Sequence, residues 1–232
     1  MDSDNYNDRI ICALDFENPE RAKELVNELG DLVNIYKVGM LLQFTGGNEI
    51  LSWLLSKQKK VFLDMKYYDI PETVASVVEK VAQMGINFLT IHGNSRIIEE
   101  AVKAKSGSDL KLLAITVLTS MDAQDLEELG LKCSLEDMVM QRVEKAVEYG
   151  CDGVITSGHE VGKINSKVGS NLIKITPGIR PKGKQVNEHK RPVTPKEAIE
   201  SGADYLVIGR PLYQSFEPRR VAEEIIKDIG GA

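Results

Sequence analysis

The chain has 232 residues, of which 42% are hydrophobic and 28% are charged, a balance that is typical of a globular domain and excludes extensive disorder. Its formal net charge of −6 argues against a general nucleic-acid-binding surface, because that function needs concentrated positive charge. No apolar run approaches the ~20 residues of a membrane span, and no basic segment followed by an apolar stretch opens the sequence, so we expect a cytoplasmic protein without membrane contact.

Eight short apolar runs recur along the chain and are separated by longer segments with helical periodicity. Most of the runs are rich in Ile, Val and Leu and nearly continuous in hydrophobicity, as expected of parallel strands that are covered on both faces. In chain order, the predicted strands span residues 9–15, 34–39, 60–66, 88–93, 110–120, 153–158, 172–178 and 205–211.

The segments between these runs carry the start and stop signals of helices. In residues 18–30, Asn18 is a typical N-cap, Pro19 suits the first helical position, and Gly30 suits the position after the last turn. Similar signals predict helices over residues 71–85, 135–150, 194–202 and 218–231.

Eight alternating strand and helix units in a chain of this length predict an α/β fold, a closed (β/α)8 TIM barrel that forms a single domain over residues 1–232. The alternative is an open, doubly wound sheet, which usually carries a glycine-rich GxGxxG turn after its first strand. Here the first strand runs into the segment LDFENPE (14–20), which contains no glycine. The barrel is therefore the better prediction.

Charged residues gather where the first three predicted strands end, which is the end of a TIM barrel that carries its active site. Asp15 ends the first strand, and Lys37 lies near the end of the second. Asp64 and Lys66 end the third strand on the same face, two residues apart, and Asp69 follows in the next loop. Because buried charges are costly unless they are paired, the alternating signs predict an array that holds a lysine ammonium as a proton donor. The alternative is a salt-bridge network that only closes the barrel.

Glycines and arginines at the ends of the seventh and eighth predicted strands indicate a phosphate site. The seventh strand ends in TPGIR (176–180) and the eighth in IGRP (208–211), and the loops after these strands form the usual phosphate site of TIM barrels. Gly178 and Gly209 permit close approach of the backbone, and Arg180 and Arg210 can bind a phosphate with a fork of N–H groups. The alternative is a pair of ordinary turns with surface arginines.

A long polar loop over residues 180–193 follows the seventh predicted strand. Its position predicts a lid or ligand loop, and the alternative is a solvated surface loop.

Residues 64–71 read DMKYYDIP and follow the pattern DxKxxDIP. This pattern is the signature of the orotidine 5′-phosphate decarboxylase family, which the sequence resembles. Further family motifs follow in the same order: ALD at 13–15, KVG at 37–39, VLTS at 117–120, TPGIR at 176–180 and IGRP at 208–211. The resemblance extends from about residue 9 to the end of the chain.

This resemblance implies decarboxylation of orotidine 5′-phosphate to uridine 5′-phosphate, the last step of de novo pyrimidine synthesis, without a metal or an organic cofactor. It implies that Lys66 protonates C6 of the pyrimidine and that Asp64 lies beside the carboxylate of the substrate. Lys37 and Asp69 would complete the charged array. The resemblance also implies a homodimer in which Asp69, Ile70 and Thr73 reach the site across the subunit interface.

The resemblance assigns the remaining contacts to parts of the nucleotide. Asp15 and Lys37 would hold the ribose hydroxyls, Thr119 or Ser120 would reach the pyrimidine, and Arg180, Gly209 and Arg210 would hold the phosphate. The expected substrate-binding residues are Asp15, Lys37, Ile70, Thr73, Thr119, Ser120, Pro177, Arg180, His189, Gly209 and Arg210.

The sequence departs from the family pattern at two places. His189 stands where the family usually has a phosphate-binding glutamine, and Gln185 is the nearest glutamine. Tyr67, Tyr68 and Glu72 replace the Phe-His pair and the Asn that often flank the second aspartate of the signature.

Two other functions fit parts of the pattern. A magnesium-dependent sugar-phosphate decarboxylase or aldolase of the same superfamily shares the DxKxxD core, but it uses an acidic metal ligand near the end of the second strand, where this chain has Lys37. A catalytically inactive nucleotide-binding barrel would have no need of the costly set formed by Asp64, Lys66 and Asp69.

Overall fold

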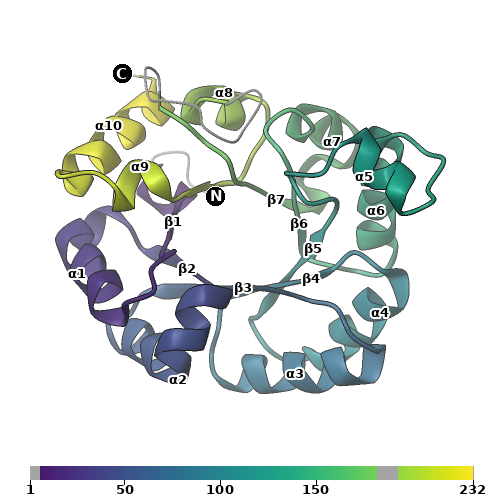
Figure 1. Ribbon diagram of the computed structural model, residues 1–232, viewed down its shortest axis with the longest axis horizontal. Coiled ribbons are helices and arrows are strands. Elements are labelled where there is room, and N and C mark those ends of the chain that lie inside the picture. The colour runs from purple at the N-terminus through teal and green to yellow at the C-terminus, as the bar shows by residue number, and fades with distance from the viewer. Residues whose placement is uncertain (1–5, 182–192, 232) are drawn as a thin grey trace.

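The computed structural model describes residues 6–181 and 193–231 and shows a closed barrel of eight parallel strands inside a ring of helices (Figure 1). Each strand pairs with the next one along the chain, and β8 pairs with β1 to close the barrel. The strands are β1 (Ile10–Ala13), β2 (Ile35–Gly39), β3 (Lys60–Tyr67), β4 (Phe88–His92), β5 (Lys111–Ile115), β6 (Gly153–Ile155), β7 (Ile173–Thr176) and β8 (Tyr205–Ile208). The TIM-barrel prediction is confirmed.

Two of the predicted helices begin with capping contacts at residues that the sequence marks as caps. The side chain of Asn18 accepts a hydrogen bond from the N–H of Glu20 at the start of α1, and Thr194 caps α8 in a reciprocal pair with Glu197. The helices are α1 (Pro19–Leu29), α2 (Met40–Ser56), α3 (Pro71–Gln83), α4 (Ser95–Ala104), α5 (Ala123–Glu128), α6 (Leu135–Glu148), α7 (Val161–Val168), α8 (Pro195–Glu200), α9 (Arg210–Tyr213) and α10 (Pro218–Gly230). Short 3-10 helices are η1 (Tyr6–Arg9), η2 (Gly30–Leu32) and η3 (Gly169–Asn171).

Several predicted strands end earlier than expected, and the fifth shows the largest difference. The run over residues 110–120 was expected to be a strand throughout, but β5 ends at Ile115 and irregular backbone follows as far as α5. The apolar residues beyond Ile115 misled the prediction, because a hydrophobic run looks the same whether it continues a strand or lines a cavity.

Strand residues alternate between two apolar layers, and this alternation positions the site. Phe62 points into the barrel, where it packs with side chains such as Phe88 and Leu113, whereas Leu63 packs in the larger cluster between the strands and the helices. The interior of the barrel is therefore a packed core, and the side chains at the strand ends line a cavity above it. Within the described part of the chain, no helix is both long enough and apolar enough to cross a membrane.

Candidate active site

A cavity of about 360 Å³ opens at the carboxyl ends of the strands. Its walls come from the ends of β1, β2, β3, β5, β6, β7 and β8 and from the loops that follow them. Ten of the residues predicted for the site line this cavity: Asp15, Lys37, Asp64, Lys66, Thr119, Ser120, Pro177, Arg180, Gly209 and Arg210. The structure thus brings together residues that lie almost 200 positions apart in the sequence.

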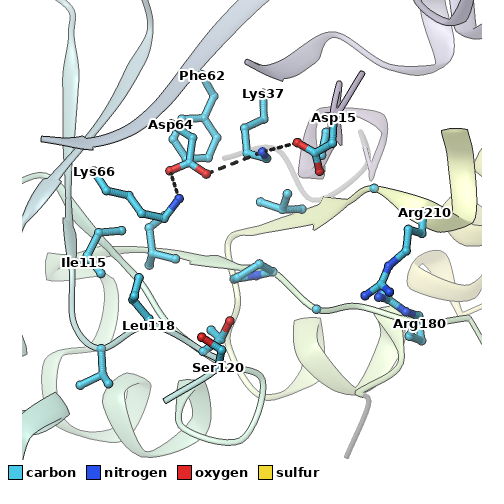
Figure 2. A pocket seen from close by; sticks show the side chains of 18 of the residues that line it. Asp15, Lys37, Phe62, Asp64, Lys66, Ile115, Leu118, Ser120, Arg180 and Arg210 are labelled. Carbon is cyan, nitrogen blue, oxygen red and sulfur yellow. Dashed lines mark hydrogen bonds and ion pairs between the residues drawn. The ribbon is translucent and has the colours of Figure 1, made fainter. Parts of the chain in front are cut away.

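Four charged side chains form a continuous chain of alternating sign along one wall of the cavity (Figure 2). The Nζ atom of Lys37 lies 2.9 Å from Oδ1 of Asp15 and 3.7 Å from Oδ2 of Asp64. The Nζ atom of Lys66 lies 2.9 Å from Oδ1 of Asp64. Asp64 therefore lies between the two lysines and balances both ammonium groups.

The two lysines differ in how far they are open to the cavity. The Lys37 side chain is only 11% exposed, and it is the inner member of the array. Burial opposes its charge, but the Asp15 and Asp64 carboxylates outweigh that effect and hold the pKa of Lys37 above its ordinary value. The Lys66 side chain is 37% exposed and lines the cavity, so its ammonium can meet a ligand. A network that only closed the barrel would have no reason to leave one cation open.

The backbone at Lys66 is strained. Its φ angle is +52°, in the left-handed region that residues other than glycine rarely adopt. The pairing of β3 with β4 breaks between Leu63 and Tyr67, so Lys66 lies in an irregularity of the strand. Such a conformation costs on the order of 1–3 kcal/mol and persists where the surroundings fix it, often at functional sites. The strain therefore adds an independent reason to assign a function to Lys66.

Apolar side chains form the wall next to Lys66, and the sequence did not reveal them as site residues. Ile115 and Leu118 lie beside Lys66 in Figure 2, and Val117 and Ile155 also line the cavity. Ile115 and Ile155 are the last residues of β5 and β6, so their inward direction could have been read from strand alternation. Apolar walls exclude water once a ligand fills the cavity, which strengthens the field of the ammonium on that ligand.

Two arginines lie at the opposite side of the cavity. The guanidinium groups of Arg180, after β7, and Arg210, at the start of α9, lie next to each other in Figure 2. Gly178 has a φ angle of +81°, which a residue with a side chain adopts only at a cost, and a Cβ atom at Gly209 would lie 3.3 Å from the ring of Tyr213. Two like charges held together by glycine-dependent turns suit a doubly charged anion such as a phosphate.

Three predicted site residues lie outside the cavity of the single chain. Asp69, Ile70 and Thr73 are exposed at the loop after β3 and the start of α3. The Asp69 carboxylate accepts a hydrogen bond from the N–H of Ile70 at 2.7 Å. His189 and Gln185, the candidates for the phosphate-binding glutamine, and most of the predicted lid loop lie outside the described residues.

His92, at the end of β4, belongs to the protein scaffold and does not line the cavity with the charged array. Its ring stacks on that of Tyr68 with the centroids 4.0 Å apart. Burial, together with the nearby charge of Arg142, lowers the pKa of His92 to about 4. Among the described residues, no cluster of three or more His, Cys, Asp or Glu side chains has the geometry to hold a metal ion.

A barrel with a lysine–aspartate array on one side of its cavity and two arginines on the other defines an enzyme for a small anionic molecule. Comparison with known proteins identifies the family. The profile of the "Orotidine 5′-phosphate decarboxylase / HUMPS family" matches residues 8–225, and the chain belongs to this family.

Full-length relatives carry the first of these two names. The chain is 47% identical over 231 residues to an orotidine 5′-phosphate decarboxylase of Nitrobacter winogradskyi, a match that covers 100% of this chain and 96% of the relative. It is 42% identical over 230 residues to one of Methylococcus capsulatus, with 97% and 94% covered. A crystal structure of orotidine 5′-phosphate decarboxylase from Lactobacillus acidophilus superposes with a TM-score of 0.84 at 34% identity, covering 96% of this chain and 99% of that one.

Proposed function

We propose that this chain is an orotidine 5′-phosphate decarboxylase, which converts orotidine 5′-phosphate to uridine 5′-phosphate and CO2 in the last step of UMP biosynthesis, in the cytoplasm. Family membership and the names of the full-length relatives support the reaction. The observation that carries the proposal is the ammonium of Lys66, which is paired with Asp64 and open to the cavity.

The geometry suits one orientation of the nucleotide. The phosphate binds between Arg180 and Arg210, where the backbone at Gly209 also comes close. The ribose hydroxyls meet Asp15 and Lys37, which are hydrogen-bonded to each other and lie between the arginines and Lys66.

The pyrimidine ring then fills the part of the cavity next to Lys66. Thr119 and Ser120, in the loop after β5, offer polar groups to its edge, and Pro177 lies on the wall of the same cavity. The carboxylate of the substrate faces the Asp64–Lys66 end of the array.

The chemical step is electrostatic and needs one proton. The bond between C6 and the carboxylate breaks, CO2 leaves, and the electron pair remains on C6. The Lys66 ammonium stabilises this developing negative charge and donates its proton to C6, which forms uridine 5′-phosphate. Asp64 holds the ammonium in position, and its own charge lies beside the carboxylate that leaves, so the repulsion is relieved as CO2 departs. No metal or organic cofactor takes part in this scheme.

The active unit in this proposal is a homodimer. Asp69, Ile70 and Thr73 stay outside the cavity of their own chain and would enter the site of the second copy. Exposed apolar residues in this segment support the interface: Ile70 is 63% exposed, and Tyr68, two residues before it, is 68% exposed.

Release of labelled CO2 from carboxyl-labelled orotidine 5′-phosphate tests the function of the purified chain. We expect turnover that EDTA does not change. Loss of activity with EDTA and its return with Mg²⁺ would favour the sugar-phosphate enzymes of the superfamily. Binding of uridine 5′-phosphate without turnover would identify an inactive nucleotide-binding barrel.

A further inference from the structure

We infer that Thr90 is a positioning residue for the proton donor, an inference that rests on the proposed decarboxylase function. Thr90 is the third residue of β4, and its side chain is completely buried. Its hydroxyl donates a hydrogen bond to Oδ1 of Asp64 at 2.9 Å and accepts one from the backbone N–H of Lys66, also at 2.9 Å. The hydroxyl has one hydrogen to donate, and that hydrogen goes to the Asp64 carboxylate.

These contacts close a ring through the catalytic pair. The backbone of Lys66 donates to Thr90, Thr90 donates to Asp64, and the ammonium of Lys66 donates to the same Oδ1 atom of Asp64 at 2.9 Å. Thr90 thus fixes both ends of one lysine, its backbone directly and its ammonium through the carboxylate. Because Thr90 is fully buried, it acts on the reaction only through these two residues.

The strained backbone explains why a side-chain hydroxyl is needed at this point. In a regular parallel ladder, alternate N–H groups of β3 would donate to carbonyl groups of β4. Here the register jumps from Leu63 opposite Leu89 to Tyr67 opposite Ile91. The N–H of Lys66 falls inside this jump and donates to the hydroxyl of Thr90 instead. The φ angle of +52° at Lys66 is therefore held by a contact that the hydroxyl of Thr90 supplies.

Two substitutions of Thr90 separate positioning from packing. Thr90→Val keeps the shape and removes the hydroxyl, whereas Thr90→Ser keeps the hydroxyl and removes a methyl group. Thr116→Val is the matched control, because Thr116 is also buried and donates one hydrogen bond, to the carbonyl oxygen of Ile155 at 2.9 Å. The readouts are kcat and KM for orotidine 5′-phosphate and the melting temperature of each variant.

We expect kcat of Thr90→Val to fall roughly 10- to 100-fold with KM changed less than about threefold, because a misplaced catalytic group affects the reaction more than binding. Thr90→Ser should recover kcat to within about threefold of the wild type, and Thr116→Val should keep the wild-type kcat while losing a comparable amount of stability. If Thr90→Val does not fold, Thr90→Ala takes its place in the same comparison.

The possible failures are distinguishable. Equal kcat values for wild type and Thr90→Val overturn the inference and leave the proposed function intact. Equal losses of kcat in Thr90→Val, Thr90→Ser and Thr116→Val also overturn it, because they would show a general packing effect. A wild-type chain without turnover overturns the proposed function, and the inference falls with it.

Discussion

Lys66 and Asp64 leave the same strand two residues apart, and their Nζ and Oδ1 atoms meet at 2.9 Å. The same carboxylate reaches Lys37 with its other oxygen at 3.7 Å. A single aspartate therefore orients the exposed lysine and balances the buried one. This arrangement holds a proton donor in place before a substrate arrives, which avoids the cost of reorganising charges during the reaction.

Removal of the donor should abolish catalysis without unfolding the protein. We expect Lys66→Ala to lower kcat by at least about 1000-fold, since general-acid and electrostatic contributions of this kind reach that size. Its melting temperature should stay close to that of the wild type, because Lys66 is partly exposed. Lys167→Ala, on the outside of α7, is the control for loss of a lysine that is paired with an acidic residue. Near-normal kcat in Lys66→Ala would refute the assigned role.

Replacement of Arg210 should weaken binding of the substrate through its phosphate group. We expect Arg210→Ala to raise KM by about 100-fold, in line with the loss of a charge-assisted contact to the substrate. The inhibition constants of uridine 5′-phosphate and uridine identify the cause, because only the nucleotide has the phosphate. Arg210→Ala should weaken binding of uridine 5′-phosphate and leave binding of uridine unchanged. Arg220→Ala, on the exposed side of α10, should change neither inhibition constant. An unchanged KM would remove Arg210 from the phosphate site.

Shared active sites should be visible in mixtures of two inactive variants. If Asp69 acts in the partner's site, each active site takes Lys66 from one subunit and Asp69 from the other. Lys66→Ala and Asp69→Ala then inactivate a site from opposite sides of the interface. After subunit exchange, half of the dimers are hybrids with one intact site, so about a quarter of the wild-type activity should return. Lys66→Ala mixed with Asp64→Ala is the control and should stay inactive, because both lesions are on the same side of the interface. No recovery in the first mixture would place Asp69 outside the partner's site.

The stability of the protein should depend on His92 at mildly acidic pH. Burial and Arg142 lower its pKa from 6.5 to about 4 in the folded chain, so the unfolded chain binds a proton first as the pH falls. The free energy of unfolding therefore decreases as the pH falls from about 6.5 to about 4, and the effect is absent at pH 8. His92→Phe keeps an aromatic ring against Tyr68 but cannot bind a proton. Between pH 7.5 and 4.5, we expect the free energy of unfolding of this variant to fall by about 1–2 kcal/mol less than that of the wild type, after allowance for partial exposure.

Urea unfolding at the two pH values measures this difference. The same pH dependence in wild type and His92→Phe would show that the ring of His92 titrates as in the unfolded chain.

The sequence predicted the barrel because its signals are local and repeated. Continuous apolar runs, capped helix starts such as that at Asn18, and glycine stops such as Gly30 all recur with each unit. The direction of Asp64 followed from strand alternation, because Phe62 and Asp64 do share the inner face of β3. The cavity residues that follow β7 and β8 were predicted because arginine and glycine are conspicuous after apolar strands.

The remaining features depend on three-dimensional context. Leu118 reads as part of a continuing strand, since its hydrophobicity is the same whether it faces a core or a ligand. The positive φ angle of Lys66 has no sequence signal, because glycine is the residue that usually marks this conformation. The contact between Thr90 and Asp64 joins residues of two strands that are 26 positions apart in the sequence, so the pattern within one strand does not predict it.

The most direct test is a crystal structure of the protein with a 6-substituted uridine 5′-monophosphate in the cavity. The proposed mechanism predicts that the Nζ atom of Lys66 lies within about 3.5 Å of C6 or its substituent, the separation needed for proton transfer. It also predicts the phosphate between Arg180 and Arg210. A structure in which the amine of Lys66 points away from C6, with another group in its place, would contradict the central role of this lysine.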